Sequence, residues 1–259
     1  MEIEGYLKKD YIGNLLKTGK RADGRAFDEY RKITIQKGYS AEKACGSAMV
    51  QLGKTKVIAG ISLDIGEPYS DRPKDGVMST GTELRPIASP RFESGPPNEE
   101  SIEVARVIDR GIRESGSIDT KKMFVEDDLV WIAFIDIHVM DHCGNLIDAG
   151  GIAAIAALMN TRLPKYEDGK LIYGEYAGKL PIKCVPVPCT FAKVGDNILI
   201  DPEMDEEYAM DARLTVSTTD TINAMQKGGL GAFKEDEIMA AVDMSFEKGK
   251  QIRSMLESD

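Results

Sequence analysis

This 259-residue chain lacks the features that mark several large protein classes. Its four cysteines (Cys45, Cys143, Cys184 and Cys189) show no Cys-x-x-Cys spacing, which favours free, buried thiols in a reducing cytoplasm over a disulfide framework. No segment reaches the roughly 18 consecutive apolar residues of a membrane span. The first residues also lack the basic and apolar regions of a signal peptide. We therefore expect a cytoplasmic protein without a membrane partner.

Positive charge is also in deficit. The chain has 33 Lys and Arg residues against 43 Asp and Glu residues, so its formal net charge is −10. Nucleic-acid binders usually carry an excess of positive charge, because much of their affinity comes from neutralising phosphates. Either nucleic acid is not a ligand of this chain, or its basic residues gather in one patch. With 42% hydrophobic residues, the chain is long enough for one large globular domain or two small ones.

The first part of the chain mixes strand and helix patterns. The patterns predict a helix over 2–17, a strand over 32–37, and a hairpin of 47–52 and 56–64 turned at Gly53-Lys54. A long surface loop over 66–98 follows, and then a helix over about 99–115 capped by Asn98. The last predicted elements of this part are a central strand over 129–139, a turn at 141–145 followed by a short strand, and a buried helix over 152–160 opened by Gly150-Gly151.

The second part repeats that order of elements. It begins with a polar, irregular stretch over 161–183 and an edge strand over 185–189. A hairpin turned at Gly195-Asp196, an acidic turn over 201–211 and a strand over 212–218 follow. The chain then forms a Gly228–Gly231 loop and a helix over about 235–257. We place the domain boundary between 185 and 186. The expected fold class is therefore α+β, with domains 1–185 and 186–259 related by a distant internal duplication.

Three arginines lie on one face of the helix predicted over 99–115. Arg106, Arg110 and Arg113 follow a spacing of four and then three residues, beside an apolar stripe formed by Ile102, Ala105, Ile108 and Ile112. They could form a solvated face, since Glu103, Asp109 and Glu114 can pair with them within the helix. They could instead bind phosphates, which suit the fork of a guanidinium. Spacing alone leaves both readings open.

Two further groups have competing interpretations. Gly150-Gly151 at a helix start could hold an anion on backbone N–H groups, or could serve close helix packing. The only two histidines, His138 and His142, lie near Asp136, Asp141 and Cys143. They straddle a strand end and a turn rather than one helical face, so no metal site and no cofactor are expected.

The acidic tract Asp201–Asp211 and the strand after it resemble the catalytic turn of the RNase PH family of phosphorolytic exoribonucleases. Active members carry two Asp six residues apart, and this chain has Glu207 and Arg213 at those positions. A guanidinium cannot act as a base or hold a metal ion. Active members also follow their glycines with Thr or Ser and then Arg to hold phosphate, whereas Ile152 and Ala153 follow Gly151 here. Both sites therefore look degenerate, and we assign no catalytic residue.

The resemblance covers about residues 10–255 and is strongest to the non-catalytic RNase PH-type ring subunits of archaeal exosomes. It rests on the combination of Lys20–Arg25, Gly46–Val57, Ser89–Pro97, the Arg106 helix, Asp148–Gly151 and the turn and strand over 201–218. It implies two β-α sandwich domains in a ring, where three copies alternate with three copies of a catalytic sister subunit. RNA is then shortened from its 3′ end by inorganic phosphate bound at the sister's site.

The resemblance also implies a role for the arginines. Arg110 and Arg113, followed by Arg106, would hold single-stranded RNA, and RNA-binding cap subunits would be separate chains. Two alternatives remain. The chain could be an active enzyme that uses Asp205, Glu207 or Asp211, or it could be an assembly scaffold without RNA contact.

Overall fold

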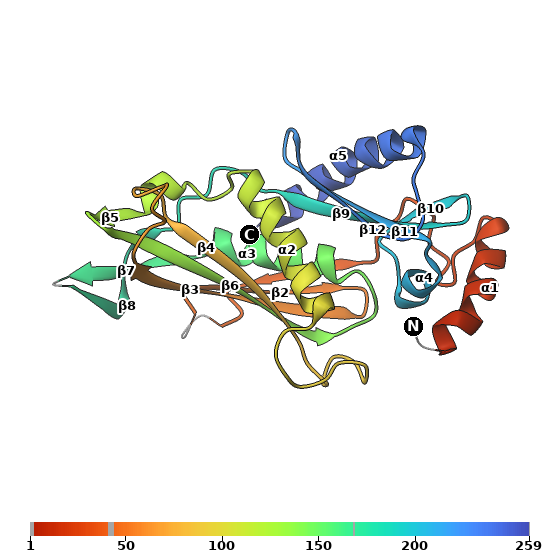
Figure 1. The fold of residues 1–259 in the computed structure, drawn as a ribbon, viewed down its shortest axis with the longest axis horizontal. Helices are drawn as coiled ribbons and strands as arrows, with labels where there is room; N and C mark the ends of the chain where they lie inside the picture. The colour runs from red at the N-terminus through yellow and green to blue at the C-terminus, as the bar shows by residue number, and fades with distance from the viewer. Residues whose placement is uncertain (1–2, 41–43, 168, 259) are drawn as a thin grey trace.

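The computed structural model describes residues 3–40, 44–167 and 169–258 and contains two β-sheets with helices packed on them (Figure 1). The first sheet has the order β1-β2-β3-β6-β4, and a short strand, β5, also pairs with β6. Its strands pair antiparallel except for β4 and β6, which run parallel. They are β1 (Ile33–Lys37), β2 (Gly46–Leu52), β3 (Thr55–Gly66), β4 (Val77–Leu84), β5 (Phe124–Glu126) and β6 (Leu129–Asp141).

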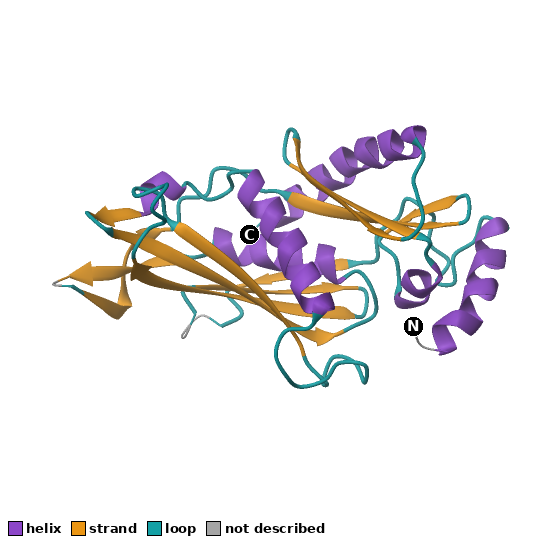
Figure 2. Cartoon of the chain, viewed as in Figure 1, coloured by secondary structure: helices purple, strands orange, loops and turns teal. Residues whose placement is uncertain are grey.

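The second sheet is antiparallel and has the order β10-β9-β11-β12. Its strands are β9 (Val187–Val194), β10 (Asn197–Ile200), β11 (Ala212–Thr218) and β12 (Ile222–Gly229). A separate two-stranded hairpin of β7 (Arg162–Glu167) and β8 (Lys170–Lys179) projects from the end of the molecule away from the second sheet (Figure 2). The helices are α1 (Ile3–Lys17), α2 (Glu99–Glu114), a 3-10 turn η1 (Thr120–Met123), α3 (Leu146–Met159), α4 (Met204–Ala209) and α5 (Glu235–Glu257).

Helix α3 joins the two sheets. It contacts β2, β3 and β6 of the first sheet and β9 of the second, and residues 146–158 are all buried. A Cβ atom at Gly150 would lie 2.8 Å from Cδ1 of Ile108, and one at Gly151 would lie 2.5 Å from Cγ of Pro188. The glycine pair therefore allows α2 and β9 to pack closely on α3.

The expected start of this helix was wrong. Helix α3 begins at Leu146, and Asn145 caps it through its side chain, which accepts a hydrogen bond from the backbone N–H of Asp148. No strand separates the 141–145 turn from the helix, and Gly150-Gly151 lie inside it. The continuous apolar composition gave no periodic signal at its first turn, so the glycines were mistaken for its beginning.

Three other local expectations were wrong, and a fourth was incomplete. The loop expected over 66–98 contains β4, and the stretch 161–183 contains the β7–β8 hairpin. The edge strand expected over 185–189 is longer than expected: it is β9, which runs to Val194, and β10 pairs with its second half. Pro188 is tolerated there because it pairs with Ser217 of β11 in a part of β9 that β10 does not reach. On α2, Ile102 is 47% exposed rather than buried.

Much of the remaining order was confirmed. The β2–β3 hairpin turns at Gly53 and the β9–β10 hairpin at Gly195, each with a φ of +59°. Asn98 caps α2, and α5 spans Glu235–Glu257. The boundary between 185 and 186 stays a prediction; it falls just before β9. No described helix is long and apolar enough to cross a membrane. All four cysteines are free, and of these Cys45 and Cys189 are buried.

Candidate functional site

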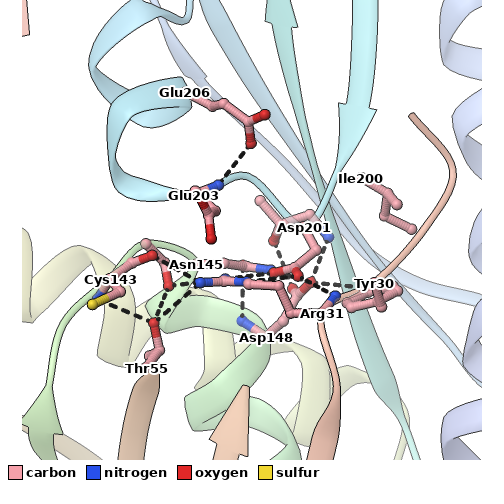
Figure 3. A network of polar contacts seen from close by, with 12 residues as sticks. Tyr30, Arg31, Thr55, Cys143, Asn145, Asp148, Ile200, Asp201, Glu203 and Glu206 are labelled. Carbon is pink, nitrogen blue, oxygen red and sulfur yellow. Dashed lines mark hydrogen bonds and ion pairs between the residues drawn. The ribbon is translucent and has the colours of Figure 1, made fainter. Parts of the chain in front are cut away.

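The acidic turn that precedes β11 is held by a buried polar network (Figure 3). Asp201 accepts two hydrogen bonds from the Arg31 guanidinium, at 2.7 and 2.8 Å, and a third from the backbone N–H of Arg31. Burial alone would raise the pKa of Asp201, but the hydrogen bonds and charge of Arg31 hold it below its ordinary value. This pair joins the segment before β1 to the end of β10.

Asn145 and Asp148 extend the network into the first turn of α3. The Asn145 side chain donates to Asp201 at 2.8 Å and to Asp148 at 2.9 Å. Asp148 also accepts hydrogen bonds from the Tyr30 hydroxyl and from the backbone and side chain of Thr190 on β9. Burial raises the pKa of Asp148 to about 6 despite these donors. The network therefore fixes α3, β9 and the acidic turn relative to one another.

A second buried ion pair fixes α4. Arg21 binds both carboxylate oxygens of Glu206, at 2.6 and 2.9 Å, and also donates to the carbonyls of Ile200 and Asp201. Glu206 in turn accepts a hydrogen bond from the backbone N–H of Glu203 and closes a capping box at the start of α4. The two ion pairs therefore hold the turn in a defined geometry.

Glu207 and Arg213, the two positions expected to be degenerate, line one cleft of about 260 Å³, which we call the degenerate cleft. The side chain of Arg213 donates from Nη2 to Oε1 of Glu103 at 2.5 Å. Glu207 accepts a 2.8 Å hydrogen bond from the backbone N–H of Asn145. Burial raises the pKa of Glu207 to about 7, against the lowering effect of that hydrogen bond and of the Arg213 charge. Two glutamates thus bracket the arginine where the family's active members carry paired acids.

The rest of the cleft wall contains aromatic and basic side chains together with Glu100 and aliphatic residues. His142 stacks on Phe92 with ring centroids 5.3 Å apart, and burial together with the charges of Arg91 and Arg31 lowers its pKa to about 4. Arg91 donates to the Tyr208 hydroxyl at 2.7 Å. A neutral imidazole stacked in this way serves packing. His138 lies on β6, where it contacts Glu83 at 3.4 Å. In the described part of the chain, no three His, Cys, Asp or Glu side chains group as metal ligands would.

The degenerate phosphate positions lie in the hydrophobic core. Ile152 and Ala153 are 0% exposed, and Gly151 packs against Pro188. Because these residues are inside α3, their backbone N–H groups belong to the helix rather than to an open helix start. The close-packing interpretation of Gly150-Gly151 is confirmed. These residues offer no surface to an anion.

The other acids considered as substitutes do not converge on the cleft. Asp205 pairs with Lys8 at 2.9 Å. Asp211 pairs with Lys9 at 3.0 Å and accepts a hydrogen bond from the backbone N–H of Gly195. Neither residue lines the degenerate cleft, whereas Glu207 does. Of these three acids, Glu207 alone therefore lines this cleft.

The structure divides the three arginines of α2 between two surfaces. Arg106 and Arg110 line a groove of about 410 Å³ with Gln226 of β12, and Arg110 lies 3.3 Å from the Gln226 side-chain oxygen. Arg113 lines another cavity and binds Asp109 through two 2.9 Å hydrogen bonds. Its Nη2 also donates to the Met78 carbonyl. Of the predicted intrahelical pairs, the Asp109–Arg113 pair is present.

Sequence reasoning missed two contributors to this region. Asn145 donates to Glu207 through its backbone and to Asp201 and Asp148 through its side chain, and it has a positive φ of +54°. Its place directly before a long apolar stretch was a signal for a helix cap. Gln226 is on β12, a strand with mostly exposed residues that the sequence did not reveal.

Comparison with known proteins accounts for this arrangement. Residues 29–164 match domain 1 of the 3′ exoribonuclease family, and residues 184–248 match domain 2. This chain belongs to the RNase PH family of 3′ exoribonucleases. A family member described as exosome complex component Rrp42, from Thermococcus gammatolerans, is 52% identical over 99% of this chain and 96% of its own length. A relative of the same description from Thermoplasma acidophilum is 48% identical over 97% and 96%.

Solved structures of family members agree with this assignment. A chain in a structure described as the Archaeoglobus fulgidus exosome with RNA bound to the active site matches with a TM-score of 0.91 and 43% identity, over 99% of this chain and 100% of that one. A rice Rrp46 structure matches at a TM-score of 0.70 with 16% identity, which shows the shared fold alone. The two-domain RNase PH-like fold expected from the sequence is confirmed.

Proposed function

We propose that this chain is a non-catalytic, RNA-binding and architectural subunit of an archaeal exosome ring. It works beside a catalytic sister subunit of the same fold in 3′–5′ phosphorolytic degradation of RNA. Three copies of each alternate in a hetero-hexamer in the cytoplasm, and RNA-binding cap subunits are separate chains. Inorganic phosphate binds at the sister's site, and this chain needs no cofactor. The high identity to exosome components along nearly the whole chain supports this proposal.

The observation that carries the non-catalytic assignment is the state of the degenerate cleft. One acid position holds Arg213, which is paired with Glu103, and the phosphate positions Ile152 and Ala153 are inside the core. Phosphorolysis requires an acid and a bound phosphate placed together against the substrate. Here the buried network preserves the fold of the site, but only Glu207 remains of the paired acids, and the phosphate positions are not open to an anion.

The RNA-binding part of the proposal rests on Arg106 and Arg110. They share a groove, and their guanidinium groups can approach successive phosphates of one strand. Arg113 lies on the same helix but has its charge directed toward Asp109. Because phosphorolysis depends largely on positioning and charge stabilisation, a subunit that only holds the RNA backbone still raises the rate at its neighbour's site.

The test is phosphate-dependent release of ADP from poly(A) by three samples: this chain alone, the catalytic sister alone, and their equimolar mixture. We expect no activity from this chain, and a higher rate from the mixture than from the sister. The mixture should sediment as a species near six subunits, as expected for alternating copies. Robust ADP release by the pure chain would contradict the non-catalytic assignment. Two subunits that sediment separately would contradict the architectural role.

A further inference from the structure

A cationic groove lies at the opposite end of α3 from the degenerate cleft. It has a volume of about 640 Å³, and its walls are the segment 179–185, the turn between β11 and β12 and the last turns of α5. Met159 at the C-terminal end of α3 lines it, whereas Asn145 at the N-terminal end lines the degenerate cleft. The groove is therefore a separate surface, and nothing in the proposed function uses it.

The charge of the groove is opposite to that of the chain. The whole chain has a net charge of −10, but the groove is lined by four cationic residues and only two acids, Asp220 and Glu257. The cationic residues are Lys179, Lys183, Lys250 and Arg253. Lys183 pairs with Asp119 at 3.0 Å. In the part of the chain that the structure describes, no acid pairs with Lys179 or Lys250. These two exposed ammonium groups are available to an anionic partner.

Apolar side chains form the rest of the lining, and they favour protein over nucleic acid as the partner. Met159, Leu180, Ile182 and Val185 line the groove, and no aromatic side chain does so. Surfaces that bind single-stranded nucleic acid usually combine cations with aromatic side chains on which bases stack. A groove with an aliphatic floor and lysines at its rim fits a peptide with both aliphatic and acidic side chains.

The backbone of Ile182, in the middle of the segment 179–185, can form two hydrogen bonds with such a peptide. Ile182 forms an isolated antiparallel bridge with Ile118, and the bridge is made by its neighbours: Lys183 donates to Ser117 and Asp119 donates to Pro181. In this pattern the N–H and C=O of Ile182 point away from Ile118. Among the described residues, no hydrogen bond involves either group. Ile182 thus has one paired side and one open side, whereas the Leu180 N–H donates to the Thr161 carbonyl and the Cys184 carbonyl accepts from the Ser117 hydroxyl.

We propose that this groove docks an extended, acidic segment of a partner protein, which adds as a strand along the open edge at Ile182. Carboxylates of that segment bind Lys179 and Lys250, and its aliphatic side chains contact Met159, Leu180 and Val185. The backbone hydrogen bonds give affinity without sequence specificity, and the lysines select acidic over basic segments. The site adds a protein contact to a subunit whose proposed ligand on α2 is RNA.

The test uses the full-length chain and a dye-labelled eight-residue peptide that alternates glutamate and valine, followed by fluorescence anisotropy. We expect binding with a Kd of roughly 100 μM or tighter. The double variant Lys179→Glu, Lys250→Glu should bind at least about tenfold more weakly, because two charge-assisted contacts are lost. The matched control Lys17→Glu, Lys20→Glu changes two exposed lysines elsewhere and should bind like the wild type.

Three further probes separate the explanations. A peptide with lysine in place of glutamate should not bind, and one with N-methylated valines should bind more weakly because it lacks backbone donors. A labelled twelve-residue oligoadenylate should not compete for the groove. Equal affinity of the double variant and the wild type would overturn the proposal. So would displacement of the peptide by the oligoadenylate, which would make the groove an RNA site.

Discussion

Nη2 of Arg213 on β11 lies 2.5 Å from Oε1 of Glu103 on α2, so an ion pair occupies the position of one acid of the family's catalytic turn. The Arg213 Nε is buried and has no hydrogen-bond partner among the described residues. The pair connects the second domain to α2, the helix that carries Arg106, Arg110 and Arg113. A position that would bind substrate in an active member thus serves to hold two elements of this chain together.

Restoring the acid at this position is not expected to restore activity. In an Arg213→Asp variant the phosphate positions are still the core residues Ile152 and Ala153, so the isolated chain should release no ADP from poly(A). The variant also places a carboxylate near Glu103 and Glu207, which should lower the free energy of unfolding by roughly 1–3 kcal/mol. Arg213→Gln removes the charge alone and serves as the control. Measurable phosphorolysis by the Arg213→Asp chain would contradict the account of the degenerate cleft.

The arginines of α2 should differ in their effect on RNA. Replacing Arg106 and Arg110 with Glu should weaken RNA binding by the assembled ring and lower its rate, at roughly 1.5–3 kcal/mol for each lost contact. Binding should also become less sensitive to salt, because fewer counterions are released.

The sequence favoured Arg110 and Arg113 as the RNA-binding pair. The variant with both of these residues replaced by Glu is therefore measured beside the Arg106 and Arg110 variant. Because Arg113 already binds Asp109, Arg113→Glu alone should change RNA binding less than Arg110→Glu. The melting temperature of each variant ring should stay within a few degrees of the wild type, since an exposed intrahelical pair contributes under about 1 kcal/mol. A ring with both Arg106 and Arg110 replaced that keeps its rate and salt dependence would leave this chain as a scaffold alone.

The buried Arg31–Asp201 pair should dominate the stability of the site. Asp201→Asn leaves the Arg31 guanidinium buried without a counter-charge, and removal of one partner of a buried pair costs about 3–5 kcal/mol. Asp205→Asn, which affects only the exposed pair with Lys8, is the matched control and should cost under about 1 kcal/mol. Chemical denaturation monitored by circular dichroism measures both. Equal midpoints for the two variants would show that the network is not a determinant of stability.

Glu207 should make stability depend on pH. Its pKa is raised from 4.5 to about 7 in the folded chain, so folding favours the protonated form. Its contribution is therefore fully present below about pH 4.5 and is lost as the pH rises through 7. Glu207→Gln keeps the acceptor for the Asn145 N–H and removes the titration. The variant should gain up to roughly 3 kcal/mol over the wild type between pH 4.5 and pH 8. A stability difference that does not vary with pH would contradict the shifted pKa.

The family could be predicted from the sequence because its motifs depend on local residue identity. Arg213 cannot supply a carboxylate, and the side chains of Ile152 and Ala153 offer no hydrogen-bond donor to a phosphate, in any fold. Hairpin turns at Gly53 and Gly195 were also predictable, since a positive φ favours glycine. The Asn98 cap of α2 followed from a short polar side chain before a helical pattern.

The elements that could not be predicted depend on contacts between distant residues. Strand β4 lies among prolines and glycines and becomes regular only because β6 pairs with it. The partner of Arg213, Glu103, is 110 residues away in the chain, so spacing within α2 assigned Glu103 to Arg106 instead. The separation of Arg106 and Arg110 from Arg113 likewise depends on β12 and on the carbonyl of Met78.

The ion pair between Arg31 and Asp201 also sets the order in which parts of the chain can fold. The two residues are 170 positions apart, so Arg31 leaves the ribosome long before its counter-charge is synthesised. Until β10 and the acidic turn emerge, the guanidinium groups of Arg21 and Arg31 lack Glu206 and Asp201, the carboxylates that they bind in the folded chain. The first sheet can therefore collapse early, but the segment 21–31 can be buried only after translation has passed residue 206. Such a late, non-local closure is slow, and it couples the completion of the first domain to the folding of the second.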